Sequence, residues 1–266
     1  MSTSAPLFDP KRISCNRKRA KAKFGSHDFL HQRVWQDLME RRAVINRKLS
    51  VGVVRGDLLP ELAQISASGW SAVPQSVPVP SSLDLLISFF ELHLIDDVAG
   101  ELARCRASLA PDGVFLACLF GGRTLVELRQ SLLAAESQIT GSAAARVIPF
   151  VEVRTLGTLV GKAGFALPVI DVDTVTVRYS SLRALLRDIR NMGEGNPLFA
   201  PVRPLCNAVL TRAEELYRQD FGDENGLLPA RFDILHICGW APHESQQQPL
   251  APGSGQMFLG DALKKS

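Results

Sequence analysis

Short apolar runs and stretches of helical periodicity alternate along this chain. The short runs are apolar or β-branched, which is typical of strands, and they occupy residues 49–54, 83–90, 114–119, 169–179 and 232–240. Apolar side chains recur at helical spacing in residues 28–39, 57–65, 98–109, 124–138, 153–163, 182–192 and 205–217. Because Pro111, Asp112 and Gly113 end one helix just before a strand, we expect a βαβ unit and a parallel sheet with a right-handed crossover.

The order of these elements predicts an α/β fold with an insertion near its end. Two helices interrupt the alternation before the last strand, and they would cap the carboxyl ends of the strands, where open sheets bind ligands. The proline- and serine-rich stretch 66–82 is typical of a loop with at most one edge strand, around Val77. We expect a basic segment and helix at 1–48, a core at 49–179, a helical cap at 180–228, and a last strand with an extended tail at 229–266.

Composition changes this picture little. The 266 residues include 46% hydrophobic and 21% charged side chains, and the net charge of +3 does not favour binding to nucleic acid. The basic residues between Lys11 and Lys23 form either a solvated helix face or a docking surface for an acidic protein or RNA.

The cysteines and apolar runs bear on the compartment. Five dispersed cysteines without a CxxC pair argue against a zinc site and fit a reducing compartment. No apolar run approaches the roughly 18 residues of a membrane span, and the first residues lack the apolar region of a secretory signal. We therefore expect a cytoplasmic protein.

Several motifs resemble a known family. Residues 84–93 with Asp96 and Asp97, and the segment 109–116, resemble the fourth strand and the turn into the fifth strand of class I S-adenosylmethionine-dependent methyltransferases. Further motifs resemble one subgroup, and they lie at residues 146–150, 163–168, 176–179, 187–194 and 239–247. That subgroup contains the mitochondrial complex I assembly factor that hydroxylates an arginine, bacterial proteins labelled methyltransferases and, distantly, the malonyl-carrier methyltransferase of biotin synthesis.

The resemblance implies a Rossmann-like sheet with the strand order 3-2-1-4-5-7-6 and a site for S-adenosylmethionine. That cofactor would lie near Gly52, Gly56, Ser88, Phe89 and His93. The chain departs from the family where the cofactor needs bare main chain and a ribose-binding acid. The glycine-rich turn is reduced to Gly52 and Gly56, and residues 69–82 contain no acid.

Length is the second departure. Between residues 54 and 84 there is room for one βα unit and not for two, so the N-terminal half of the sheet should be shortened. Either cofactor binding has been lost, or the site is assembled differently.

Candidate functional residues follow from the expected strand ends. His93 is a candidate base or a packed strand-end residue, and Glu91 could accept a cofactor amine or a substrate guanidinium or be a rim charge. Arg178 and Asp188 could pair with each other or form part of a pocket for a peptide side chain. Other substrate or partner candidates are Arg123, Tyr179, Glu194 and the turn with Trp240, His243 and Glu244, which could latch over the cleft. No metal site is expected, because the HExxH spacing is absent.

Two functions remain open at this point. The resemblance implies a methyltransferase-like protein that modifies or chaperones a protein substrate, with respiratory complex I assembly as its setting. The alternative is a binding module that has lost its cofactor. No iron-binding triad is visible in the sequence, so arginine hydroxylation would rest on the resemblance alone.

Overall fold

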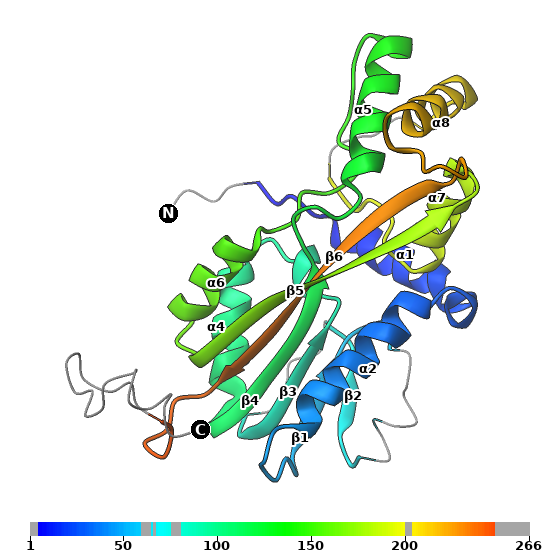
Figure 1. Cartoon of the computed structure of the whole chain (residues 1–266). Helices are drawn as coiled ribbons and strands as arrows, with labels where there is room; N and C mark the ends of the chain where they lie inside the picture. Colours follow the sequence, from blue (N-terminus) through cyan, green and yellow to red (C-terminus); the bar gives the residue numbers. More distant parts are fainter. Residues whose placement is uncertain (1–4, 60–64, 66–67, 76–80, 200–203, 248–266) are drawn as a thin grey trace, which may run out of the picture.

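A six-stranded sheet forms the centre of the protein, seen in a computed structural model that describes residues 5–59, 65, 68–75, 81–199 and 204–247 (Figure 1). The strand order is β2-β1-β3-β4-β6-β5. The strands are β1 (Gly52–Arg55), β2 (Ser71–Val73), β3 (Leu83–Phe89), β4 (Leu109–Phe120), β5 (Ala166–Tyr179) and β6 (Leu228–Trp240). The first four pair in parallel, and β6 runs antiparallel to both of its neighbours.

Helices cover both faces of this sheet. The helices are α1 (Pro10–Lys21), α2 (Phe29–Ala43), α4 (Val98–Ser108), α5 (Val126–Thr140), α6 (Val153–Lys162), α7 (Leu182–Asn191) and α8 (Asn207–Phe221), with short 3-10 turns η1 (Phe24–Ser26) and η2 (Leu92–Leu94). α2 packs on one face, where Trp35 meets Phe89 edge-on at 5.6 Å between ring centroids. α4 and α6 pack on the other face. β3 and β4 are therefore buried on both sides, which explains their continuous apolar runs.

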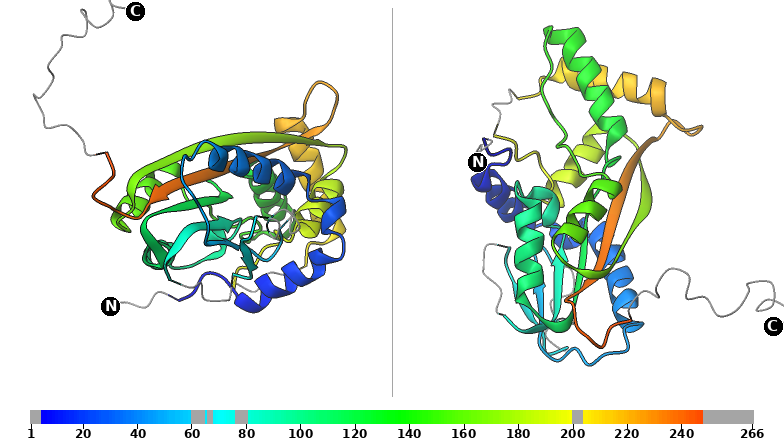
Figure 2. Two further views of the ribbon diagram at one scale, coloured as in Figure 1. Left: turned by 90° about the horizontal axis from the view of Figure 1, so that it is seen from below. Right: turned by 90° about the vertical axis from the view of Figure 1, so that its left-hand side faces the viewer.

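A helical cap of α5, α7 and α8 stands beyond the carboxyl ends of the parallel strands, so it includes α5 besides the predicted residues 180–228 (Figures 1 and 2). α5 follows β4 directly, α8 packs along α5, and α7 lies beside α1. Leu128 of α5, Leu185 of α7 and Val209 of α8 belong to the same buried core as the α2 face of the sheet. The cap is thus continuous with the main core.

The observed strand order matches the expected order 3-2-1-4-5-7-6 without strand 3, which would lie at the edge beside β2. Within the described residues, one strand and not two lies between β1 and β3, as the short spacing predicts. The expected fold class is confirmed: the sheet is mostly parallel and Rossmann-like, shortened in its N-terminal half, with helices inserted before the last strand.

Some local predictions were wrong or cannot be compared. Residues 111–113 do not separate helix from strand; they form a bulge inside β4, because Leu83 pairs with Leu109 but Leu85 pairs with Val114. Asp112 adopts φ +63°, so the residues that favour a turn serve a bulge instead. The edge strand is β2, before the predicted position at Val77, which lies outside the described residues. The helix predicted at 57–65 also falls largely outside them.

In the part of the chain that the structure describes, no helix is both long and apolar enough to cross a membrane.

Gly193 fixes the end of α7 against the start of the chain. Its φ is +84°, and an added Cβ would lie 2.7 Å from Leu58 Cδ1 and 3.2 Å from Arg17 Cδ. Gly141 follows α5 with a similar φ of +72°, but a Cβ there would meet nothing within 4 Å. Substitutions at these two glycines therefore distinguish the cost of backbone strain from the cost of overpacking.

We predict that Gly193→Ala lowers the free energy of unfolding by about 2–4 kcal/mol, since strain and overpacking add. Gly141→Ala should cost only about 1 kcal/mol, because it carries the strain alone. Urea denaturation of both variants measures the difference. Equal losses would show that the packing around Gly193 is not tight.

Candidate functional site

A buried cluster of charged side chains lies at the carboxyl end of β3. Arg17 reaches in from α1 and donates from Nη1 to Glu194 Oε1 at 2.9 Å and from Nη2 to the Phe90 carbonyl at 2.8 Å. Its Nη2 also lies 3.9 Å from Glu91 Oε1. His93 Nε2 lies 3.0 Å from Glu194 Oε2, so Glu194 is held from two sides. We call Arg17, Glu91, His93 and Glu194 the buried charge cluster.

The environment moves the carboxyl groups of this cluster in opposite directions. Burial raises the pKa of Glu91 from its usual 4.5 to about 7, and the more distant Arg17 offsets this only in part. Burial also opposes ionisation of Glu194, but Arg17 and His93 outweigh it and lower its pKa to about 2. Glu194 is therefore ionised at neutral pH, and the His93 Nε2 proton points at it.

His31 of α2 borders the same cluster. Burial lowers its pKa to about 3, so the ring is neutral at physiological pH. It packs edge-on against Phe24, 4.9 Å between ring centroids, and neither ring nitrogen has a hydrogen-bond partner among the described residues. His31 therefore acts as an apolar wall of the cluster and not as a proton carrier.

The turn after β1 is closed by the protein itself. The Asp57 N–H, which follows Gly56, donates to Glu91 Oε1 at 2.8 Å. An added Cβ on Gly56 would lie 2.9 Å from Leu59 Cδ2, and one on Gly52 would lie 2.4 Å from the Trp70 indole. Both glycines thus serve close packing inside the protein, and neither presents bare main chain to a ligand.

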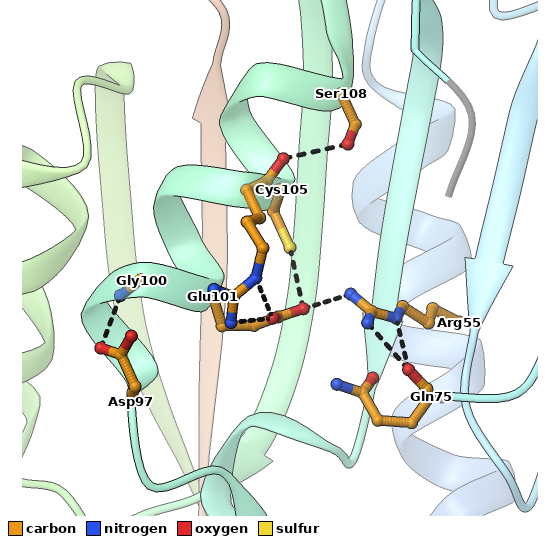
Figure 3. A network of polar contacts seen from close by, with 8 residues as sticks. Arg55, Gln75, Asp97, Gly100, Glu101, Cys105 and Ser108 are labelled. Atoms are coloured by element: carbon orange, nitrogen blue, oxygen red, sulfur yellow. Dashed lines mark hydrogen bonds and ion pairs between the residues drawn. The ribbon is translucent and has the colours of Figure 1, made fainter. Parts of the chain in front are cut away.

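A second network ties the ends of β1 and β2 together (Figure 3). Arg55, the last residue of β1, donates from Nη2 to the Gln75 carbonyl at 2.8 Å and pairs with Glu101 of α4. Glu101 also pairs with Arg104 at 2.7 Å. Arg55 and Glu101 are nearly buried, so a cation and its partners fill the edge where a ribose-binding acid is expected.

These residues do not fit S-adenosylmethionine as class I methyltransferases hold it. Space is not the limit, because hollows of about 510 and 430 Å³ flank Lys21 and Asp57 beside the ends of β1 and β2. The missing feature is the set of polar partners. The N–H after Gly56 is already bonded, and Pro74 and Gln75, not an acid, follow β2. Asp57, a carboxylate that lines both hollows, accepts the Gln75 N–H at 3.3 Å.

A separate cavity of about 400 Å³ opens on the cap side of the cluster, between α1, α5 and α7. We call it the cap cavity. Apolar side chains of α5 and α7 form much of its wall, and Glu194 joins it to the buried charge cluster. Arginines and asparagines line the remainder: Arg12, Asn16, Arg19, Arg146, Arg190 and Asn196.

The structure gathers only some of the predicted site residues. His93, Glu91 and Glu194 meet in the cluster, although all three are almost fully shielded from solvent. Ser88 and Phe89, predicted to bind the cofactor, are buried within the sheet, and Phe89 lies under α2. The guanidinium beside Glu91 is the protein's own Arg17.

Other candidates lie elsewhere. Arg178 pairs with Asp223 at 3.1 Å and not with Asp188, which instead binds His27 Nδ1 at 2.8 Å. Tyr179 is buried at the end of β5, and Arg123 is exposed before α5.

The turn that contains Trp240, His243 and Glu244 lies at the opposite end of the strands from the cap cavity. β6 is antiparallel to β4, so Trp240 pairs with Val114 whereas Ile234 pairs with Phe120. Gln246 of this turn bonds Asp112 at 2.7 Å. The described part of the turn, up to residue 247, therefore does not latch over the cleft, and the rest of the predicted tail lies outside the described residues.

Arg17 is the functional residue that sequence reasoning missed. It lies within the basic segment that we interpreted as a solvated or docking surface, yet its side chain is 5% exposed. One signal was present: Arg17 shares a helical stripe with Ile13, Ala20 and Phe24, whose spacing marks a face turned inward.

Among the described residues, no group of three or more histidine, cysteine, aspartate or glutamate side chains could hold a metal ion.

Comparison with curated proteins places this geometry in context. The chain is 39% identical over 181 residues to "Arginine-hydroxylase NDUFAF5, mitochondrial" of Dictyostelium discoideum, which covers 68% of this chain and 42% of that protein. It is 36% identical over 184 residues to the human protein of that name, with 69% and 53% covered. It is 31% identical over 169 residues to the malonyl-[acyl-carrier protein] O-methyltransferase of Xylella fastidiosa, with 63% and 55% covered. The chain spans about half the length of these relatives.

The names of these relatives correct one prediction. Those at 36–39% identity are named as mitochondrial proteins, so the predicted cytoplasmic location was wrong.

Solved structures give weaker likenesses. The YcgJ protein of Bacillus subtilis superposes with a TM-score of 0.46 at 13% identity, covering 77% of this chain and 97% of that one. A phosphoethanolamine N-methyltransferase of Haemonchus contortus, in complex with S-adenosylhomocysteine, gives a TM-score of 0.42 at 16% identity and covers 78% and 52%.

No family model matches the chain. Its sequence likeness to the named relatives and its strand order agree with the motifs in its second half. The chain belongs to the class I S-adenosylmethionine-dependent methyltransferase superfamily, in the group of the NDUFAF5 arginine-hydroxylases and, more distantly, the malonyl-[acyl-carrier protein] O-methyltransferases.

Proposed function

We propose that this chain is a non-catalytic member of its family that binds a protein segment in the cap cavity. One observation carries the proposal: the turn after β1 donates its N–H to the protein's own Glu91, at 2.8 Å, where a cofactor would need that group free. The cap cavity, by contrast, is still open. The scaffold therefore keeps an open cavity for a partner, whereas the main-chain N–H that would hold the cofactor is already bonded.

The setting of this binding role comes from the relatives. By resemblance to the NDUFAF5 proteins, we assign the partner to respiratory complex I assembly, with a complex I subunit as the protein bound. The cavity supports a segment of polypeptide, since a half-open apolar pocket of this size suits a side chain or short peptide. Catalysis on that segment is not part of the proposal.

The buried charge cluster supports the same reading. Arg17 fills the space between the cofactor side and the cap cavity, and it satisfies Glu194 and the Phe90 carbonyl at once. Moving Arg17 aside would leave the ionised Glu194 buried without its main partner, which costs several kcal/mol. The resting protein therefore keeps the two sides separated.

One prediction concerns the cofactor. At about 1 mM S-adenosylmethionine, the melting temperature should stay within about 1 °C of its value without ligand. A site with a Kd near 10 µM would add about 2.7 kcal/mol and raise it by several degrees. Differential scanning calorimetry measures this, with the Xylella fastidiosa methyltransferase as the positive control. A rise that grows with cofactor concentration would refute the proposal.

A further prediction uses the opposite pKa shifts of Glu91 and Glu194. Burial raises the pKa of Glu91 to about 7, so the unfolded chain loses this proton at a lower pH than the folded protein does. The free energy of unfolding therefore falls as pH rises from 4.5 to 7. Glu91→Gln, which mimics the protonated acid, should be about 3 kcal/mol more stable than the parent at pH 8 and nearly equal at pH 5.

Glu194→Gln is the matched variant with the opposite sign. The lowered pKa of Glu194 contributes stability above pH 4.5 that disappears as pH falls towards 2. This variant should therefore lose about 3 kcal/mol at pH 7. Urea denaturation between pH 5 and 8 measures both profiles, and parallel profiles for the two variants would contradict the described electrostatics.

A further inference from the structure

We infer that the cap cavity takes an apolar anchor from a segment whose flanking acidic residues pair with Arg19 and Arg190. This inference rests on the proposed function, because it names the chemistry of the segment that the cavity binds. Two features of the cavity carry it: an apolar wall and a rim with unsatisfied positive charge.

The wall is built by two helices of the cap. Leu125, Leu128 and Leu132 come from the start of α5 and its first turns, and Leu186 and Ile189 come from α7. The volume of about 400 Å³ falls within the roughly 300–1,000 Å³ of natural ligand pockets. An aliphatic or aromatic side chain that enters here is removed from water, which favours binding in proportion to the apolar area that it buries.

Some arginine side chains of the rim are already paired within the protein, and others are not. Arg12 and Arg146 are already engaged, the first by the Leu198 carbonyl at 2.6 Å and the second by Glu136. The side chains of Arg19 and Arg190 form no hydrogen bond or ion pair with any of the described residues, although both residues line the cavity. Two free guanidinium groups at the mouth of an apolar cavity suit carboxylates next to the anchor.

Positive charge continues beyond the cavity along α1. Lys11, Lys18, Lys21 and Lys23 are exposed on this helix and just after it. Lys18 and Lys21, however, line the hollow on the other side of α1, so the cavity itself decides the ligand. Arg19 of α1 and Arg190 of α7 border the cavity from two different helices. An acidic polypeptide carries carboxylates on both sides of an apolar anchor and can meet both guanidinium groups, so we commit to a protein segment.

A synthetic peptide tests the inference on the full-length protein. The probe is a short fluorescein-labelled peptide with a central leucine–phenylalanine pair flanked by glutamates, and fluorescence anisotropy measures its Kd. Arg19→Glu/Arg190→Glu should weaken binding at least about tenfold, since two attractions become repulsions. Both side chains are exposed, so the variant should melt at the temperature of the parent.

Two controls isolate the two features. Arg154→Glu makes the same kind of charge change at an exposed position on α6, outside the cavity, and should leave the Kd within about twofold. A peptide with serines in place of the leucine–phenylalanine pair should bind at least about tenfold more weakly than the probe.

Three outcomes would overturn the inference. The first is equal binding of the probe by the parent and the double variant. The second is equal binding of the serine peptide, because the cavity would then contribute nothing. The third is tighter binding of a short RNA or of decanoate than of the peptide. Cofactor binding in the calorimetric experiment would instead overturn the proposed function, so the two failures can be told apart.

Discussion

The arrangement of this protein depends on the hydrogen bonds that the buried Arg17 guanidinium donates. A charge withdrawn from water is tolerated only when partners surround it, and here Glu194 and the Phe90 carbonyl do so from two separate elements. This requirement fixes α1 over the carboxyl ends of the strands. Once α1 is fixed there, it walls the cap cavity on one side and the hollow beside Asp57 on the other.

The proposed function requires that a cofactor fold be stable without its cofactor. In an open Rossmann-like site the ligand would satisfy the polar groups at the strand ends. In this protein Glu91 bonds the turn after β1, and Arg55 joins the ends of β1 and β2 through the Gln75 carbonyl. Internal hydrogen bonds thus satisfy polar groups at the strand ends that a bound nucleoside would otherwise meet.

The sequence predicted the strands, helices and fold class well, because burial on two faces imposes a continuous apolar run on β3 and β4. It predicted less where one local pattern serves two structures. Pro111 to Gly113 suit a turn and a bulge equally, and only the pairing with Leu83 and Leu85 decides between them. The residues of β6 likewise do not indicate the direction of the strand, so the turn after Trp240 was assigned to the wrong end of the strands.

The site was harder to predict for a related reason. A run of cations does not reveal which member is buried, since the partners of Arg17 lie 73 and 177 positions away along the chain. His93, Glu91 and Glu194 were recognised singly from strand-end positions and a family motif. Their assembly around one guanidinium depends on how α1 and the segment after α7 meet in space, and no local pattern encodes that meeting.

The separation of 177 positions between Arg17 and Glu194 also matters during biosynthesis. A ribosome that adds about 5–20 residues per second needs roughly 10–35 s to make the partner after α1 has emerged. Throughout that interval Arg17 lacks Glu194, the carboxylate to which it donates, although Glu91 is made sooner. The nascent chain therefore passes through a period in which its first helix is available to chaperones or to an early-binding partner, and docking of α1 closes that period.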